Sequence, residues 1–88
     1  MNEKEFVGLV KKAVAYYANA HLDKTDAVKI TEEQVFIVWM CKTLQNSKAL
    51  ASTTLFDGMY YELTYNGDKK ELYLDAYKKW DNRCISCG

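Results

Sequence analysis

The stretch MYYELTYNGDKKELYLD, residues 59–75, decides the fold because two alternating segments flank a turn. Asn66 and Gly67 are residue types that tolerate the positive φ angles of hairpin turns. Side chains alternate between the two faces of a strand, so each face of the predicted hairpin has its own set. One face receives Met59, Tyr61, Leu63, Leu72 and Leu74; the other receives Tyr60, Glu62, Thr64, Glu71 and Tyr73. The first set predicts a side that faces the core, and the second predicts a side open to solvent or to a partner.

The register of this hairpin depends on the length of its loop. Asn-Gly favours a two-residue loop, but that loop sets Glu62 opposite Glu71, and like charges directly opposite one another are destabilising. A four-residue loop over residues 66–69 avoids this contact and is the one we predict. Its pairs are Leu63 with Leu72, Tyr61 with Leu74, and Thr64 with Glu71. Both loops keep the same faces, because they differ by an even shift.

The N-terminal residues predict a helix. Asn2 and Glu5 have the spacing of a capping box. Apolar side chains then recur at helical intervals, namely Phe6, Leu9, Val10, Ala13, Val14 and Tyr17. We expect this helix to end near Ala20 or His21 and residues 22–29 to form a polar loop.

The middle of the chain predicts two further strands. Thr31 and Gln34 form a second capping box, which favours a single helical turn. Residues 35–44 carry β-branched and aromatic side chains at both odd and even positions, which is typical of a strand covered on both faces or of a central strand. A helix continuing from the capping box is the alternative. A turn at 45–47, a strand over 48–53 and a turn at 56–58 complete this region.

The order of elements predicts an α+β fold. Asp75 is placed to cap a short C-terminal helix with Ala76, Tyr77 and Trp80 on its apolar side. Sequential strands joined by short turns form an antiparallel meander. We therefore predict a single domain over residues 1–83, with an N-terminal helix, a four-stranded antiparallel meander sheet and a short C-terminal helix, followed by a tail over 84–88.

Composition narrows the function classes. Twelve basic and twelve acidic side chains cancel, so there is no basic excess to steer the chain toward a phosphate backbone. No apolar run approaches the ~20 residues of a membrane span, and the N-terminus does not read as a signal peptide. Three cysteines, an odd count, fit a reducing compartment better than a disulfide framework. These features predict a cytoplasmic protein without a membrane partner.

The residues with catalytic or metal-binding chemistry are few. His21 lies near Asp23 and Asp26, but no nucleophile is placed beside it, and a histidine at a helix end is typical of a dipole or solvent contact. Cys84 and Cys87 have the spacing of half a zinc site, which a second chain would have to complete. We predict no cofactor, no metal and no enzymatic activity.

Two groups of residues are candidates for binding. Tyr60 and Tyr73 share one hairpin face, and Tyr77 and Trp80 follow closely. Aromatic side chains of this kind are enriched in protein interfaces and also stack on bases, although the predicted last helix would bury them if it packed on this face.

The hairpin tip near residue 45 is the second candidate. Lys42, Asn46 and Lys48 lie there, and they are suited to contact a phosphate or a nucleotide. The alternative is a solvated turn, as most exposed lysines are.

Three runs of sequence resemble a known family. They are WMCKTLQNSKALAST (39–53), DGMYYE (57–62) and TYNGDKKE (64–71). The family consists of small proteins of unknown function encoded by phages and prophages of Gram-positive bacteria. The resemblance extends from about Tyr16 to Trp80 and leaves out residues 84–88. It implies a phage origin and residence in the bacterial host cytoplasm, and it implies no activity, cofactor or catalytic residue.

These observations lead to three hypotheses from different classes. The first is a non-enzymatic interaction module that binds and modulates a host or phage protein, with a homodimer as a related arrangement. The second is a single-strand nucleic-acid or nucleotide binder that uses Lys42, Lys48, Tyr60 and Tyr73. The third is a zinc-bridged dimer formed through Cys84 and Cys87.

Overall fold

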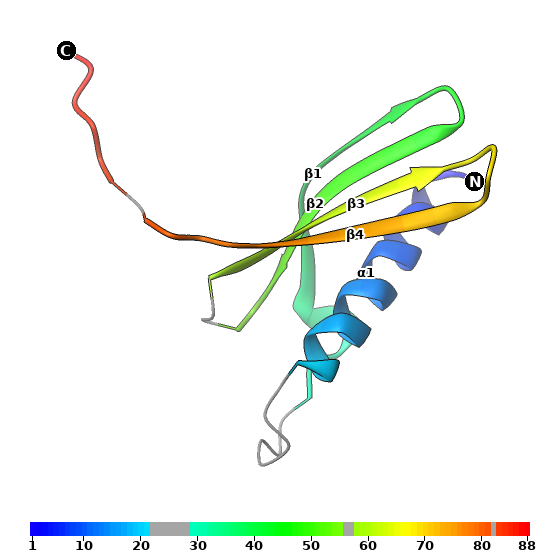
Figure 1. The fold of residues 1–88 in the computed structure, drawn as a ribbon, viewed down its shortest axis with the longest axis horizontal. Helices are drawn as coiled ribbons and strands as arrows, with labels where there is room; N and C mark the ends of the chain where they lie inside the picture. The colour runs from blue at the N-terminus through cyan, green and yellow to red at the C-terminus, as the bar shows by residue number, and fades with distance from the viewer. Residues whose placement is uncertain (22–28, 56–57, 82) are drawn as a thin grey trace.

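The fold is one long helix followed by a four-stranded antiparallel sheet. The computed structural model describes residues 1–21, 29–55, 58–81 and 83–88. Its elements are α1 (Glu3–Ala20), the 3₁₀ turn η1 (Glu32–Gln34), β1 (Val35–Thr43), β2 (Asn46–Thr53), β3 (Met59–Asn66) and β4 (Glu71–Lys78). The strands pair in the order β1-β2-β3-β4, and every neighbouring pair is antiparallel. Figure 1 shows α1 running along one side of this sheet. The predicted α+β class, N-terminal helix and four-stranded meander are therefore confirmed.

Helix α1 begins and ends where the sequence predicted. The Asn2 side chain accepts a hydrogen bond from the backbone N–H of Glu5 at 2.8 Å, which satisfies one of the free donors of the first turn. The buried face of the helix consists of Phe6, Val10, Val14, Ala15 and Ala18. At the C-terminal end, the ring of His21 stacks on the ring of Tyr17.

The core lies between α1 and the face of the sheet that α1 covers, which we call the inner face. The helix residues meet Ala49 and Ala51 of β2 and Tyr61 and Leu63 of β3, all of which are buried. The rings of Tyr17 and Tyr61 make an edge contact at 5.6 Å between centroids. One layer of helix on one layer of sheet is a common way to bury a single apolar face.

The Asn19 side chain fastens the chain that leads into the sheet. Its amide nitrogen donates to the carbonyl of Ile30 at 2.8 Å, and its oxygen accepts from the N–H of Ile30 at 2.7 Å. Ile30 is buried and belongs to the core. Of the polar loop predicted over residues 22–29, only exposed Lys29 lies within the described residues.

Strand β1 corrects the prediction for residues 35–44. The strand is confirmed, but it is an edge strand, and its second face is open. Pairing passes from Ile37 opposite Ala51 to Trp39 opposite Leu50, so Val38 is the extra residue of a β-bulge. Ile37 points to the core before the bulge, and Met40 does so after it. The bulge therefore explains the apolar residues at both odd and even positions, and it directs Trp39 away from the core.

The first hairpin turn begins one residue earlier than predicted, and the strand after it begins two residues earlier. Leu44 and Gln45 form the turn, and β2 starts at Asn46. Leu44 has a positive φ of 55° and is exposed. Positive φ is unfavourable for a residue with a side chain, which is why the turn is hard to place from sequence.

The second hairpin has the predicted loop length but a different register. Its four loop residues are 67–70, so Leu63 pairs with Leu74 and Thr64 with Tyr73. The predicted pairing of Leu63 with Leu72 is wrong by two residues. Asn66 stays in the ladder while its side-chain oxygen accepts hydrogen bonds from the backbone N–H groups of Asp68 and Lys69. Because the shift is even, the predicted assignment of side chains to the two faces is confirmed.

Gly67 is needed for a close approach between the two hairpin tips. A Cβ atom at this position would lie 2.2 Å from the carbonyl oxygen of Gln45. The backbone N–H of Gly67 also donates to the side-chain oxygen of Asn46 at 3.3 Å. The positive φ expected for Asn66 and Gly67 occurs instead at Lys70, where φ is 53°.

The predicted short C-terminal helix is wrong. Residues 71–78 form β4, in which Asp75 lies opposite Glu62 and Lys78 opposite Met59. Residues 71–78 pair with β3 along its whole length, which satisfies the backbone N–H and C=O groups of both strands. A helix beginning at Asp75 would leave the facing backbone groups of β3 without these partners. Beyond β4, residues 79–81 and 83–88 form a C-terminal segment that extends away from the sheet (Figure 1).

Candidate functional site

The candidate site is the face of the sheet opposite α1, which we call the outer face. The strand register lays one row of side chains across its middle. Trp39 lies opposite Leu50, Leu50 opposite Glu62, and Glu62 opposite Asp75. Each of the four strands contributes one member, so the row places two apolar side chains beside two carboxylates.

A second group of aromatic side chains occupies the end of the outer face near the start of β3. Tyr60 lies opposite Tyr77, and Phe36 lies opposite Ser52. The Lys79 ammonium lies 5.9 Å from the centroid of the Tyr60 ring, which is within the range of a cation–π contact. A hollow of about 480 Å³ opens here, which we call the end pocket. Its lining includes Phe36, Leu55, Met59, Tyr60 and Lys79.

The opposite end of the outer face is more polar. Tyr73 lies opposite Thr64, and Thr64 lies opposite Lys48. The Tyr73 hydroxyl donates a hydrogen bond to the Glu71 carboxylate. This bond, together with the negative charge of Glu71, raises the pKa of Tyr73 above its ordinary value. The Tyr73 hydroxyl therefore keeps its proton to higher pH than an ordinary tyrosine does.

The aromatic side chains of the outer face remain accessible. Trp39 is 44% exposed, Tyr77 is 52% exposed and Tyr73 is 54% exposed. Single exposed apolar side chains are ordinary on protein surfaces, but three exposed aromatic side chains on one sheet face make that face a candidate for binding. No segment of the described chain covers this group.

The charges of the outer face are unevenly matched. Lys48 and Glu62 form an ion pair at 3.2 Å. Glu62 also lies directly opposite Asp75, and like charges in this position destabilise a sheet. Among the described residues, Asp75 takes part in no ion pair. The middle of the outer face can therefore accept one further positive charge.

The predicted aromatic site residues are brought together only in part. Tyr60, Tyr73 and Tyr77 share the outer face. Trp80 does not join them, because it follows β4 in the C-terminal segment and is 92% exposed. Burial of these aromatics beneath a final helix is excluded, since residues 71–78 are a strand.

The three polar candidates at the first hairpin tip do not form one site. The Lys42 ammonium donates to the carbonyl of Met1 at 3.1 Å, and Lys42 pairs with buried Ser47. Lys48 lies on the outer face, on the other side of the sheet, where it pairs with Glu62. The side-chain oxygen of Asn46 accepts a hydrogen bond from the N–H of Gly67.

The cysteines are free thiols on the surface. Cys41, Cys84 and Cys87 are all exposed. In the parts of the chain that the structure describes, no group of three or more His, Cys, Asp or Glu residues is arranged to hold a metal ion. Asp23 and Asp26, considered above as neighbours of His21, lie outside the described residues.

A comparison with protein families identifies the family of the chain. Residues 8–87 match the model of a family of unknown function, DUF6275. The chain belongs to this family. The match reaches residue 87, so it includes residues 84–87, which the resemblance left out. The search of curated proteins and the search of solved structures each found no match.

This DUF6275 domain also contains site residues that sequence reasoning missed. Phe36, Trp39, Leu50 and Asp75 all lie on the outer face. The sequence feature that could have indicated these residues is the apolar run over residues 35–41. A β-bulge explains apolar side chains at both odd and even positions of this run as well as burial on both faces does. Within the described residues, no helix has the length and apolar character needed to cross a membrane.

Proposed function

We propose that this protein is a non-enzymatic interaction module that binds another protein through the outer face of its sheet. The partner presents a lysine or arginine side chain flanked by apolar side chains. The observation that supports this proposal is the row across the outer face, in which Trp39 and Leu50 lie beside Glu62 and Asp75. The apolar half suits apolar partner side chains, and the carboxylates suit a cation.

The apolar half accounts for affinity. Trp and Tyr anchors dominate the binding energy of many protein interfaces. Four strands spaced about 4.8 Å apart and rising about 3.3 Å per residue over eight residues span roughly 500 Å² on one face. Two such faces bury about 1,000 Å² together, which is the low end of specific interfaces. We therefore expect a partner that binds and dissociates readily.

The carboxylates account for the positive charge that we expect on the partner's surface. A cation placed beside Asp75 removes the repulsion between Asp75 and Glu62, so binding relieves an unfavourable contact of the free protein. A phosphate group at the same place adds to that repulsion. This is why we favour a protein over the nucleic-acid or nucleotide hypothesis, whose two lysines point from opposite sides of the sheet.

The biological setting of the proposal comes from the sequence resemblance. The resemblance to small phage and prophage proteins supports a phage-encoded protein of a Gram-positive host. The target is then a host or phage protein in the bacterial cytoplasm, which the module modulates by occupying its surface.

The contribution of the outer-face aromatic side chains is tested by capture from a lysate of a Gram-positive bacterium with tagged protein. Tyr77→Ala removes an outer-face ring, and Tyr16→Ala removes a ring that is 79% exposed on α1. The captured protein should bind Tyr77→Ala about 30-fold more weakly, as expected for an aromatic anchor worth about 2 kcal/mol. It should bind Tyr16→Ala as it binds wild type.

The contribution of the outer-face carboxylates is tested with a second variant and its control. Asp75→Lys places a cation where we propose the partner's cation to lie, and Asp68→Lys makes the same change at the exposed hairpin tip. Only the first should abolish capture. A protein captured equally by Asp75→Lys, Tyr77→Ala and wild type contradicts the proposal. Salt-sensitive binding of a labelled oligonucleotide that is lost in Tyr60→Ala selects the nucleic-acid hypothesis instead.

A further inference from the structure

The end pocket is an open, mostly apolar hollow that has room for one large apolar side chain. Its volume of about 480 Å³ falls in the range of about 300–1,000 Å³ seen for ligand pockets. The rings of Phe36 and Tyr60 flank it, and Leu55 and Met59 add apolar surface. Lys79 supplies a positive charge at its rim. An aromatic side chain next to a carboxylate matches this combination.

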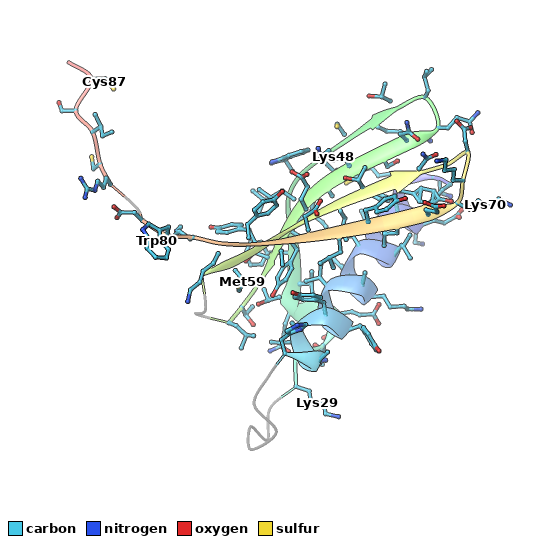
Figure 2. All side chains as sticks on the ribbon, in the orientation of Figure 1. Lys29, Lys48, Met59, Lys70, Trp80 and Cys87 are labelled. Atoms are coloured by element: carbon cyan, nitrogen blue, oxygen red, sulfur yellow. The ribbon has the colours of Figure 1, made fainter. Side chains whose placement is uncertain are left out.

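The chain itself carries such a pair in its C-terminal segment. Trp80 is followed by Asp81, and Trp80 is 92% exposed. Figure 2 shows Trp80 beyond the end of β4 and Cys87 farther out, both away from the sheet. A tryptophan side chain contributes strongly to any surface that buries it, and the exposed indole of Trp80 is accessible for such a contact. The family match includes this segment, which makes it a regular part of the domain.

Trp80 does not enter the end pocket of its own chain. The backbone N–H of Lys79 donates to the carbonyl of Gly58 at 2.6 Å, and the Lys79 side chain lies over the Tyr60 ring. Neighbouring side chains of an extended chain point to opposite sides. With Lys79 held over the outer face, Trp80 is directed away from that face and from the pocket.

We propose that Trp80 of a second copy fills the end pocket, and that two copies exchange their C-terminal segments in a closed two-fold dimer. Each copy has one pocket and one Trp80, so a single exchange satisfies both, as a two-fold interface requires. In the exchanged arrangement, Asp81 of one copy approaches Lys79 of the other. Asp81 now pairs with Arg83 of its own segment at 2.8 Å, an exposed pair that is readily replaced.

This inference goes beyond the proposed function: the end pocket lies at one end of the same outer face, but the exchange depends on Trp80, which the partner-binding row does not include. The partner-binding row is centred on Trp39 and Asp75, whereas the exchange depends on Trp80 and on the end pocket. A failure of the exchange therefore leaves the proposed function standing, and the reverse is also true.

The exchange is tested by light scattering on the full-length protein over a dilution series, with a reductant present to prevent disulfides. Wild type should show a concentration-dependent dimer. Trp80→Ala should weaken the dimer at least about 30-fold, because each dimer loses two buried indoles. Ile85→Ala, which changes another exposed apolar residue of the same segment, should leave the dissociation constant nearly unchanged.

A mixing experiment distinguishes exchange from other modes of association. Trp80→Ala keeps an intact pocket, and Phe36→Ala keeps an intact Trp80 while removing one pocket wall. Each variant alone should be largely monomeric, and an equimolar mixture should form a heterodimer with one intact contact. If Phe36→Ala does not fold, Lys79→Glu serves as the pocket variant, and adding Asp81→Lys to it should restore the dimer.

Tryptophan fluorescence reports the same event directly. In a Trp39→Phe background, Trp80 is the remaining tryptophan, and its emission should move to shorter wavelength as the protein is concentrated. A protein that is monomeric at every concentration, with the emission of an exposed indole, overturns the proposal. A dimer that Trp80→Ala leaves intact overturns it as well.

Discussion

The two faces of the sheet differ in whether another part of the chain covers them. On the inner face, Tyr61 is 2% exposed because α1 covers it. On the outer face, Tyr77 is 52% exposed, although it lies on the neighbouring strand and only one position from Ala76, the partner of Tyr61 in the ladder. Two identical side chains therefore have opposite fates in one sheet. The inner face explains why the chain folds, and the outer face presents apolar surface that folding does not use.

The largest expected effect tests this difference with matched tyrosines. Tyr61→Ala should lower the free energy of unfolding by about 3–5 kcal/mol, because it removes a buried ring and leaves a cavity against α1. Tyr77→Ala should lower it by about 1 kcal/mol or less, the value of a cross-strand pair. Denaturant unfolding followed by circular dichroism measures both. Equal losses would show that the outer face contributes to folding as much as the inner face does.

A smaller effect tests whether both faces belong to one fixed sheet. Gly67→Ala should destabilise the protein by about 1–3 kcal/mol, since its Cβ would meet the Gln45 carbonyl and force the two hairpin tips apart. Gly8→Ala is the control, because a Cβ at Gly8 has no atom within 4 Å and alanine favours a helix. Gly8→Ala should raise the thermal midpoint while Gly67→Ala lowers it. A neutral Gly67→Ala would mean that the tips, and the rows between them, are not held in this register.

A change confined to the outer face should have the opposite sign. Asp75→Asn should stabilise the free protein by about 0.2–1 kcal/mol, because it removes a carboxylate directly opposite Glu62. The same variant should bind the partner more weakly. Thermal unfolding and capture, measured side by side, check the two effects. If Asp75→Asn destabilises the fold, Asp75 has a structural role, and the proposal that the outer face prefers a positively charged partner is contradicted.

The smallest effect concerns the polar end of the outer face. The pKa of Tyr73 is raised by its bond to Glu71, so the phenol stays protonated at a pH where an ordinary tyrosine begins to ionise. Glu71→Gln removes the negative charge and should lower this pKa toward its ordinary value. An NMR titration of the Tyr73 ring resolves the shift. An unchanged pKa in Glu71→Gln would mean that this pair is not formed in solution.

Patterns confined to a few residues predicted much of the fold. The capping box at Asn2 and the helical spacing of the next apolar residues placed α1 correctly. The alternation over residues 59–75 placed Tyr61 and Leu63 in the core and Tyr60 on the other face. These features depend on neighbours in sequence, which is why they are readable without a structure.

Features set by contacts between strands were not predictable in the same way. The bulge at Val38 depends on pairing with β2, and it is what turns Trp39 to the outer face. Asp75 has the side chain of a helix cap, but ladder pairing with β3 decides its conformation. For this reason the candidate site was predicted for its tyrosines and missed for Trp39, Leu50 and Asp75.

The central claim is that the outer face binds a protein, and one titration tests it most directly. The protein captured by wild type is purified, and its dissociation constant is measured for wild type, Trp39→Ala and Tyr16→Ala. We predict that Trp39→Ala weakens binding at least about 30-fold, as for a tryptophan anchor, and that Tyr16→Ala changes it less than about 2-fold. Equal affinities for all three proteins would contradict the assignment of the outer face as the binding surface.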